Sequence, residues 1–172
     1  MQLTVRPAAD SDEAALTALD RESMSSPYVS PGTYKEHPFF TGTQPEDVIV
    51  ATLDEAVVGY AQLKPPLPLP SNAHVLMLNG LGVATSARGQ GVGARLLEAV
   101  EAHAAERGAT RVTLRVLGVN APARALYERA GYRVEGVLEG EFRLPIGPDG
   151  AVVPVDDVLM AKTVGPGQAA NV

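Results

Sequence analysis

Two periods of hydrophobic residues run along this chain, and together they predict a protein that mixes helices with strands. Apolar positions that recur every three to four residues predict helices at 11–22 and 92–105, and residues typical of helix ends predict a third helix at 120–130. Shorter apolar or alternating runs, bounded by turn-forming residues, predict strands. These strands cover residues 3–7, 48–53, 56–63, 74–83, 111–116, 132–142 and 152–162. The order of the elements therefore favours an α/β protein with one mixed sheet flanked by helices.

Three interruptions of this pattern bear on the fold. Asn79 and Gly80 break the apolar run at 74–83, which predicts a bulge or the close approach of another backbone. Residues 64–70 are rich in proline and predict an extended connection, because proline cannot donate a hydrogen bond within a central strand. Residues 23–44 are polar and predict an irregular or partly helical segment, whose aromatic residues either anchor the packing or face a substrate.

Length and composition predict one globular domain over residues 1–163, followed by a flexible tail at 164–172 that is rich in Gly, Pro and Ala. The chain has 172 residues, of which 45% are hydrophobic and 20% are charged. No apolar run approaches the ~20 residues that span a bilayer, and the start of the chain lacks the features of a signal peptide. We therefore expect a cytoplasmic protein with no membrane contact.

Cysteine content, short motifs and net charge argue against several functional classes. The sequence contains no cysteine, which excludes disulfides, zinc–thiolate centres and a cysteine nucleophile. It also contains no Gly-x-Ser-x-Gly elbow and no metal-spaced histidine pair, so a hydrolase has no support. The net charge of −6 argues against nonspecific binding of nucleic acid. A negative field instead favours a cationic substrate, such as an amine.

A glycine-rich turn at residues 88–93 lies between a predicted strand and a predicted helix. Its glycines allow a ligand to approach the backbone closely, and the helix start adds a partial positive charge. The junction therefore suits a phosphate group. Charged side chains that would add to such a site are Arg88, Arg95 and Arg124. An ordinary strand-to-helix turn is the alternative for the same residues.

Two well-known phosphate loops do not match this turn. The dinucleotide fingerprint requires Gly-x-Gly-x-x-Gly, whereas the glycines here are Gly89, Gly91 and Gly93. The Walker loop requires Gly-Lys followed by Ser or Thr, and no lysine follows these glycines. The remaining pattern is Arg-x-x-Gly-x-Gly.

A second segment, residues 120–132, has a helix with defined ends. Asn120 is a natural N-cap, and Pro122 falls in the first turn, where proline removes no hydrogen bond within the helix. Gly131 is a natural residue for the position after the helix. Tyr127 follows Asn120 by seven positions, on the same helix.

Together the two segments resemble the two signatures of the GNAT superfamily of N-acetyltransferases. The first is the acyl-CoA pyrophosphate loop; the second is an Asn at a helix start followed by Leu-Tyr and Gly-Tyr. The resemblance covers most of residues 3–163 and implies a mostly antiparallel twisted sheet with a splay at strand 4. It implies acetyl-CoA as cosubstrate and no metal. The residues that it places at the cofactor are Leu81, Gly82, Val83, Arg88, Gly89, Gln90, Gly91, Val92, Gly93, Ala94, Asn120 and Tyr127.

The reaction that the resemblance implies is direct attack of an amine on the thioester of acetyl-CoA. The amine must be neutral, the thioester carbonyl must be polarised, and the departing thiolate needs a proton or a hydrogen bond. Tyr127 aligns with the family's general acid, and a phenol with a pKa of ~10 is protonated at neutral pH. A tyrosine packed in the helix is the alternative. Asn120 either caps its helix, contacts the cofactor, or does both.

The general base is not assigned by the sequence. In the branch that acetylates ribosomal proteins, a glutamate precedes the asparagine by five positions, and Arg115 stands there in this chain. A chain of water molecules is one alternative. The side chains that remain as candidates are Glu22, His37, His74 and Glu141.

The carboxyl-terminal strands resemble those of amino-acid and polyamine acetyltransferases, at residues 137–143 and 156–162. Acidic side chains on these strands either recognise an ammonium group or face solvent. They are Glu135, Glu139, Glu141, Asp156 and Asp157.

The expected function is therefore acetylation of a small primary amine. A peptide or protein N-acetyltransferase and a non-catalytic acyl-CoA-binding regulatory module are the alternatives. The acceptor and the acyl chain length stay open, and a homodimer is compatible with the family.

Overall fold

Seven strands form one sheet in the computed structural model of the chain, which describes residues 2–24 and 37–165. The strand order is β1-β2-β3-β4-β5-β7-β6. The β4–β5 pair is parallel, whereas the other neighbouring pairs are antiparallel. The strands are β1 (Leu3–Pro7), β2 (Val48–Leu53), β3 (Ala56–Lys64), β4 (Val75–Val83), β5 (Arg111–Leu117), β6 (Arg133–Leu144) and β7 (Val153–Thr163).

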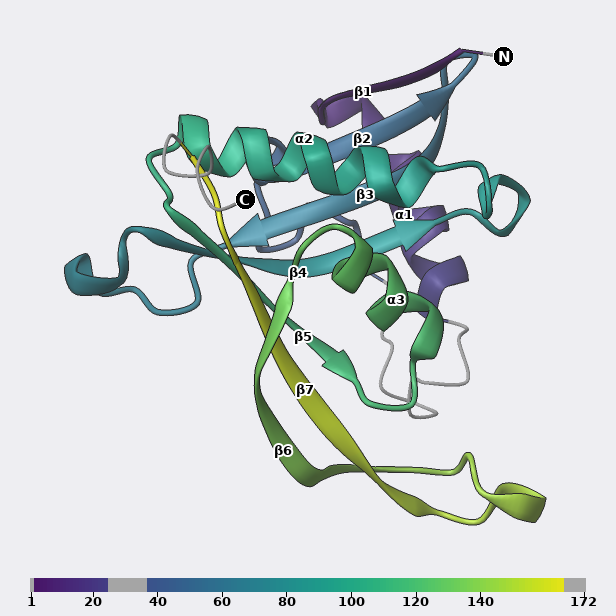
Figure 1. The fold of residues 1–172 in the computed structure, drawn as a ribbon. Helices are drawn as coiled ribbons and strands as arrows, with labels where there is room; N and C mark the ends of the chain where they lie inside the picture. Colours follow the sequence, from purple (N-terminus) through teal and green to yellow (C-terminus); the bar gives the residue numbers. More distant parts are fainter. Residues whose placement is uncertain (1, 25–36, 166–172) are drawn as a thin grey trace.

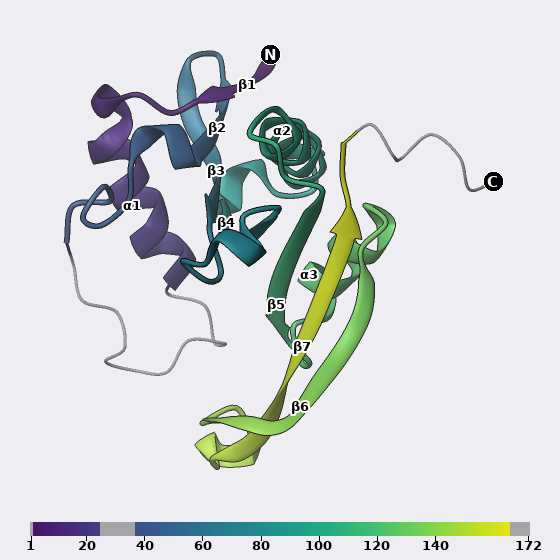
Figure 2. The ribbon, with the colours of Figure 1, turned by 90° about the vertical axis from the view of Figure 1, so that its left-hand side faces the viewer.

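The described part of the chain has three α-helices, α1 (Glu13–Met24), α2 (Val92–Glu106) and α3 (Ala121–Arg129). Figures 1 and 2 show α1 on one face of the sheet and α2 with α3 on the other. The predicted mixed, mostly antiparallel sheet with flanking helices is therefore confirmed.

A separate apolar core fills each face of the sheet. On the α1 face, Leu16 and Leu19 pack with the buried side chains of β2 and β3. On the other face, Leu96 and Val100 of α2 are fully buried in a larger cluster that includes β5, β7 and α3. Burial of these side chains from water is the main force that holds the three layers together.

The splay predicted at strand 4 is present, because β4 and β5 separate partway along their length. Their pairing ends at Leu78 and Leu114, while β4 continues beside β3 to Val83. Asn79 is the extra residue of a bulge opposite Gln62, as the break in its apolar run predicts. Figure 1 shows β5 and β7 turning away from β4 beyond this point. A gap in the sheet therefore opens along the last part of β4.

The start of the first helix differs from the prediction. A 3-10 turn over Asp10–Asp12 precedes α1, so the α-helix begins two residues later than the pattern at 11–22 indicates. The Asp12 carboxylate accepts a hydrogen bond from the Ala9 N–H at 2.9 Å. It also accepts two from the Arg6 guanidinium, at 2.7 and 2.9 Å. These bonds connect β1 to the helix entry and hold the tighter turn in place.

The predicted tail at 164–172 and the predicted irregular segment at 23–44 lie partly within the described residues. Val164, which begins the predicted tail, is only 2% exposed and donates its N–H to the Thr110 carbonyl at 3.0 Å. The tail residues 166–172 lie outside the described part of the chain. In the predicted irregular segment, the Phe39 ring packs edge-on against Tyr60, with ring centroids 5.0 Å apart.

The Asp12 ion pair predicts how stability depends on pH. Asp12→Asn should lower the free energy of unfolding by about 1–2 kcal/mol near neutral pH, because the charge-assisted hydrogen bonds to half-exposed Arg6 are lost. Those bonds hold the pKa of Asp12 below its usual range. The ionised carboxylate therefore stabilises the fold above ~pH 4, and this contribution is lost as the pH falls through the lowered folded pKa.

Urea unfolding of Asp12→Asn and wild type at about pH 7 and about pH 2 measures this contribution. Asp10→Asn is the control, because Asp10 is exposed in the same turn. A difference between Asp12→Asn and wild type that is as large in acid as at neutrality would contradict the account.

Candidate active site

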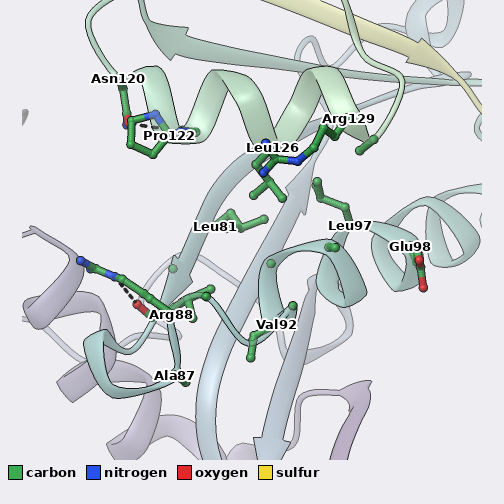
Figure 3. A pocket seen from close by; sticks show the side chains of 18 of the residues that line it. Leu81, Ala87, Arg88, Val92, Leu97, Glu98, Asn120, Pro122, Leu126 and Arg129 are labelled. Atoms are coloured by element: carbon green, nitrogen blue, oxygen red, sulfur yellow. Dashed lines mark hydrogen bonds between the residues drawn. The ribbon is translucent and has the colours of Figure 1, made fainter.

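A cavity of about 1010 Å³ lies between α2, α3 and the end of β4. Figure 3 shows α3 along one side of it, α2 on another, and the glycine-rich turn at the entrance to α2. Its volume is at the upper end of the ~300–1,000 Å³ that small-molecule and cofactor sites occupy. The cavity therefore has room for a ligand the size of a nucleotide cofactor.

The predicted cofactor residues, except Gln90 and Tyr127, line this cavity. They are Leu81, Gly82, Val83, Arg88, Gly89, Gly91, Val92, Gly93, Ala94 and Asn120. The Gln90 side chain instead donates to the Ser86 carbonyl at 2.9 Å. The glycine-rich turn, the splayed strand and the start of α3 thus meet at one site, although they lie far apart in the sequence.

The edge of β4 presents backbone groups to this cavity. The Ala84 N–H donates to the Val58 carbonyl of β3 at 2.8 Å. Backbone groups of alternate residues point the same way along a strand, so Gly82 also faces β3, whereas Leu81 and Val83 face the gap. Because no described strand pairs with this part of β4, these backbone groups can bind an extended ligand.

The entrance to α2 has the features of an anion site. Gly89 and Gly91 adopt φ values of +73° and +79°, which other L-residues rarely adopt. Gly91 is the N-cap of α2 and, having no side chain, leaves the first N–H groups of the helix uncapped. Val92, Gly93 and Ala94 line the cavity at this point. These N–H groups and the helix dipole together suit a pyrophosphate.

Arginine side chains contribute to the site differently from what the sequence indicates. Arg88 lines the cavity, but its Nε donates to the Val83 carbonyl at 3.3 Å, and Figure 3 shows its guanidinium pointing away from α2. Arg95 forms an exposed ion pair with Glu98 at 2.8 Å. Arg124 lies 3.7 Å from Glu128. Arg129 of α3, which belongs to neither sequence motif as a cofactor residue, lines the cavity instead.

The helix α3 covers the cavity with one of its faces. Asn120 caps this helix, and its Oδ1 accepts a hydrogen bond from the Ala123 N–H at 3.3 Å. Ala123, Leu126 and Ala130 line the cavity, at the spacing of one helix face. A Cβ added to Gly93 would lie 3.0 Å from Leu126, so glycine allows α2 and α3 to approach closely here.

Tyr127 lies beside this face rather than on it. Its side chain is 8% exposed, and its ring packs edge-on against Tyr132 with the centroids 6.0 Å apart. It does not line the cavity. Burial raises the pKa of Tyr127 to about 12, so the phenol is protonated over the physiological pH range.

An ion pair also lines the cavity. Lys162 of β7 and Glu101 of α2 form an ion pair at 2.6 Å, and both side chains are mostly buried. Burial, followed by the nearby Glu101 carboxylate, raises the pKa of Tyr132. Helix spacing from Ala94 could have indicated Glu101, but nothing in the local sequence indicates Lys162, which comes from a distant strand.

None of the candidate bases lines the cavity. Glu22 accepts a hydrogen bond from the Thr85 N–H at 2.7 Å, and bonds from Thr85 hold the pKa of Glu22 below its usual range. His37 Nδ1 lies 2.9 Å from the Pro38 carbonyl oxygen. His74 precedes β4 at the end opposite the splay, and Glu141 lies 3.7 Å from Arg115.

Most of the acidic residues of β6 and β7 already have partners. Glu135 pairs with Arg111. Asp157 pairs with Arg115, the residue that replaces the glutamate of the ribosomal-protein branch. Asp156 accepts a hydrogen bond from the Gly140 N–H at 2.8 Å. Among the described residues, no three His, Asp or Glu side chains are arranged to hold a metal ion. In the same part of the chain, no helix is long and apolar enough to cross a membrane.

The comparison with protein families identifies the class of protein that this fold and site define. The model of the acetyltransferase (GNAT) family matches residues 14–132, which include all of α1 but its first residue, the splayed strand, the glycine-rich turn and α3. The chain therefore belongs to the GNAT acetyltransferase family. This confirms the family resemblance of the two sequence segments.

Individual relatives agree with this assignment. The uncharacterised N-acetyltransferase YhfO of Bacillus subtilis (strain 168) is 36% identical over 85 residues, which are 49% of this chain and 57% of that protein. The match thus spans just over half the length of this curated relative. A GCN5-related N-acetyltransferase from Kribbella flavida superposes with a TM-score of 0.77 and 28% identity, over 94% of this chain and 98% of that one.

A third relative adds information about the fold alone. The structure of yncA from Salmonella typhimurium, solved with its cofactor acetyl-CoA, has a TM-score of 0.76 with this chain. The two are 18% identical, and the superposition covers 98% of this chain and 96% of that one.

The tight packing around Gly82 predicts the effect of a small substitution. A Cβ at this position would lie 2.6 Å from the Tyr60 ring and 2.7 Å from the Ser23 Oγ. Gly82→Ala should therefore destabilise the protein by about 1–3 kcal/mol and distort the edge of β4 that lines the cavity. Unfolding in urea and calorimetric titration with CoA measure the two effects.

Gly136→Ala is the matched control, because a Cβ added to this glycine of β6 meets nothing within 4 Å. It should change stability by less than about 0.5 kcal/mol. Equal stability of Gly82→Ala and Gly136→Ala would show that the contact around Gly82 is not as close as described.

Proposed function

We propose that this protein transfers the acetyl group of acetyl-CoA to the primary amine of a small molecule, such as an amino acid or a polyamine. The observation that supports this most is the meeting of two features at one cavity. The uncapped start of α2 suits a pyrophosphate, and the unpaired edge of β4 suits an extended arm with amide groups. Acetyl-CoA has both, joined in one molecule.

Binding is assigned to the residues that line the cavity. The N–H groups of Val92, Gly93 and Ala94 would hold the pyrophosphate, and the backbone of Leu81 and Val83 would hold the pantetheine arm. Acetyl-CoA supplies a thioester whose carbonyl carbon an amine can attack. A backbone N–H of β4 is well placed to polarise that carbonyl, because it belongs to a rigid strand and needs no rearrangement.

Tyr127 is proposed as the general acid at the departing thiolate. Its support is its spacing from Asn120 and a pKa of about 12, which keeps the phenol able to donate. That pKa is higher than the ~8.5 of an ordinary thiol, so complete proton transfer to the thiolate is unfavourable. We therefore expect Tyr127 to act mainly by donating a hydrogen bond as charge develops on sulfur.

A small amine is the favoured acceptor on electrostatic grounds. The net charge of −6 attracts a cation, although most acidic side chains of β6 and β7 are already paired. The amine must lose its proton before it attacks, since its pKa in water lies between ~8 and ~10.4. A cytoplasmic location and a homodimer remain predictions of the same proposal.

Release of free thiol from acetyl-CoA tests the proposed reaction. The acceptors to compare are amino acids, polyamines, aminoglycosides and peptides with a free amino terminus. Saturable release with one of the small amines is expected. Release only with peptides would favour a peptide N-acetyltransferase. Binding of CoA without release for any acceptor would favour a non-catalytic acyl-CoA-binding protein and contradict the proposal.

The role of Tyr127 predicts a selective loss of turnover. Tyr127→Phe should lower kcat about 10- to 100-fold, because it removes the hydrogen bond to the developing thiolate. The dissociation constant for CoA should stay within about twofold, since the ring and its packing are retained. Steady-state kinetics and calorimetry measure the two values.

Tyr132→Phe is the matched control. Tyr132 forms the other half of the same ring pair, and its buried hydroxyl lies near the Glu101 carboxylate. This variant should retain wild-type kcat. If Tyr127→Phe also turned over at the wild-type rate, the general-acid role would be wrong.

A further inference from the structure

Ser23 occupies a position of α1 where an apolar residue is expected. It follows Leu16 by seven positions and Leu19 by four, so it continues the stripe that these two buried leucines begin. Of the described α1 side chains, Ser23 alone lines the cavity. A polar residue thus stands where the core of the α1 face reaches the candidate active site.

The Ser23 hydroxyl is buried and has no hydrogen-bond partner in the part of the chain that the structure describes. Its Oγ is shielded from solvent and forms no hydrogen bond with any described residue. A hydroxyl held in this state is unfavourable, and alanine or a larger apolar residue would avoid the penalty. An unsatisfied group that persists at a binding cavity is a candidate for contact with a ligand.

Gly82 allows this hydroxyl to reach the splayed strand. A Cβ at position 82 would lie 2.7 Å from the Ser23 Oγ, so any larger residue would displace it. Gly82 stands between Leu81 and Val83, whose backbone groups face the gap between β4 and β5. The Ser23 hydroxyl therefore lies beside the part of β4 at which the thioester is expected.

Two hydrogen bonds fix the end of α1 around Ser23. The Tyr60 hydroxyl of β3 donates to Asp20 at 2.6 Å. The Thr85 N–H, just after β4, donates to Glu22 at 2.7 Å. Because these contacts hold the last turn of α1 against both strands, the position of Ser23 depends little on its own side chain.

The direction from which Ser23 approaches determines what it can contact. In Figure 2, α1 lies on the opposite face of the sheet from α2 and α3. The cofactor is assigned to the α2 side, so Ser23 faces the same gap from the other side. A nucleophile must reach the thioester carbonyl from a side that the cofactor does not occupy, and the α1 face is opposite the face to which the cofactor is assigned.

We propose that the Ser23 Oγ accepts a hydrogen bond from an N–H of the attacking amine and orients its lone pair toward the thioester carbonyl. This inference rests on the proposed acetyl transfer. In the reaction the N–C bond forms and the C–S bond breaks, while one proton leaves nitrogen and one reaches sulfur. Ser23 keeps its own proton and acts by holding the amine.

Ser23→Ala separates this role from a structural one. The variant should lower kcat/KM for the amine that the thiol-release assay identifies by about 10-fold or more. The dissociation constant of CoA should stay within about twofold, and the melting temperature should be unchanged or higher, because a buried unpaired hydroxyl is removed. A residue with only a structural role would lower stability and CoA affinity together.

Ser11→Ala is the control, since Ser11 is exposed in the 3-10 turn before α1. It should match wild type in all three measurements. Equal kcat/KM for Ser23→Ala and wild type would overturn the role of Ser23 and leave the proposed function intact. A parallel loss of CoA binding and stability would also overturn it. A wild-type protein that acetylates no amine would overturn the proposed function, and the role of Ser23 with it.

Discussion

The separation of β4 from β5 is the constraint on which the rest of this structure depends. The two strands pair normally up to Leu78 and Leu114 and then diverge, so within the described residues the end of β4 pairs with another strand on one side only. Unpaired backbone groups inside a protein are unfavourable unless a ligand or water satisfies them. The bulge at Asn79 and the turn of β5 toward β7 allow this opening while the remaining strands stay continuous.

Both faces of the sheet contribute to the site because of this gap. The start of α2 supplies uncapped N–H groups on one face, and α3 lies close enough to cover them because Gly93 has no side chain. On the other face, Gly82 admits the Ser23 hydroxyl. Two glycines thus set the distances between layers, and the chemistry follows from backbone groups held by a rigid sheet.

The sequence predicts the parts of the site that depend on local backbone geometry. Gly89, Gly91 and Asn120 act through φ angles and helix ends, which neighbouring residues determine. The sequence does not predict the contribution of Ser23, which depends on how α1 packs across the sheet.

The sequence also does not predict which side chains of α3 face the cavity. The family motif identifies Tyr127, yet Ala123, Leu126 and Ala130 form the face that lines the cavity. A shift of one residue rotates a side chain by about 100° around a helix, and the packing of Tyr127 against Tyr132 decides where its ring lies.

Amide hydrogen exchange of Leu81 and Val83, with and without CoA, tests the open edge of β4 most directly. We predict that CoA slows exchange at these two amides. The exchange rates of the Gly82 and Ala84 amides, which already face β3, should change much less. Calorimetric binding of CoA with no slowing at Leu81 and Val83 would contradict the account.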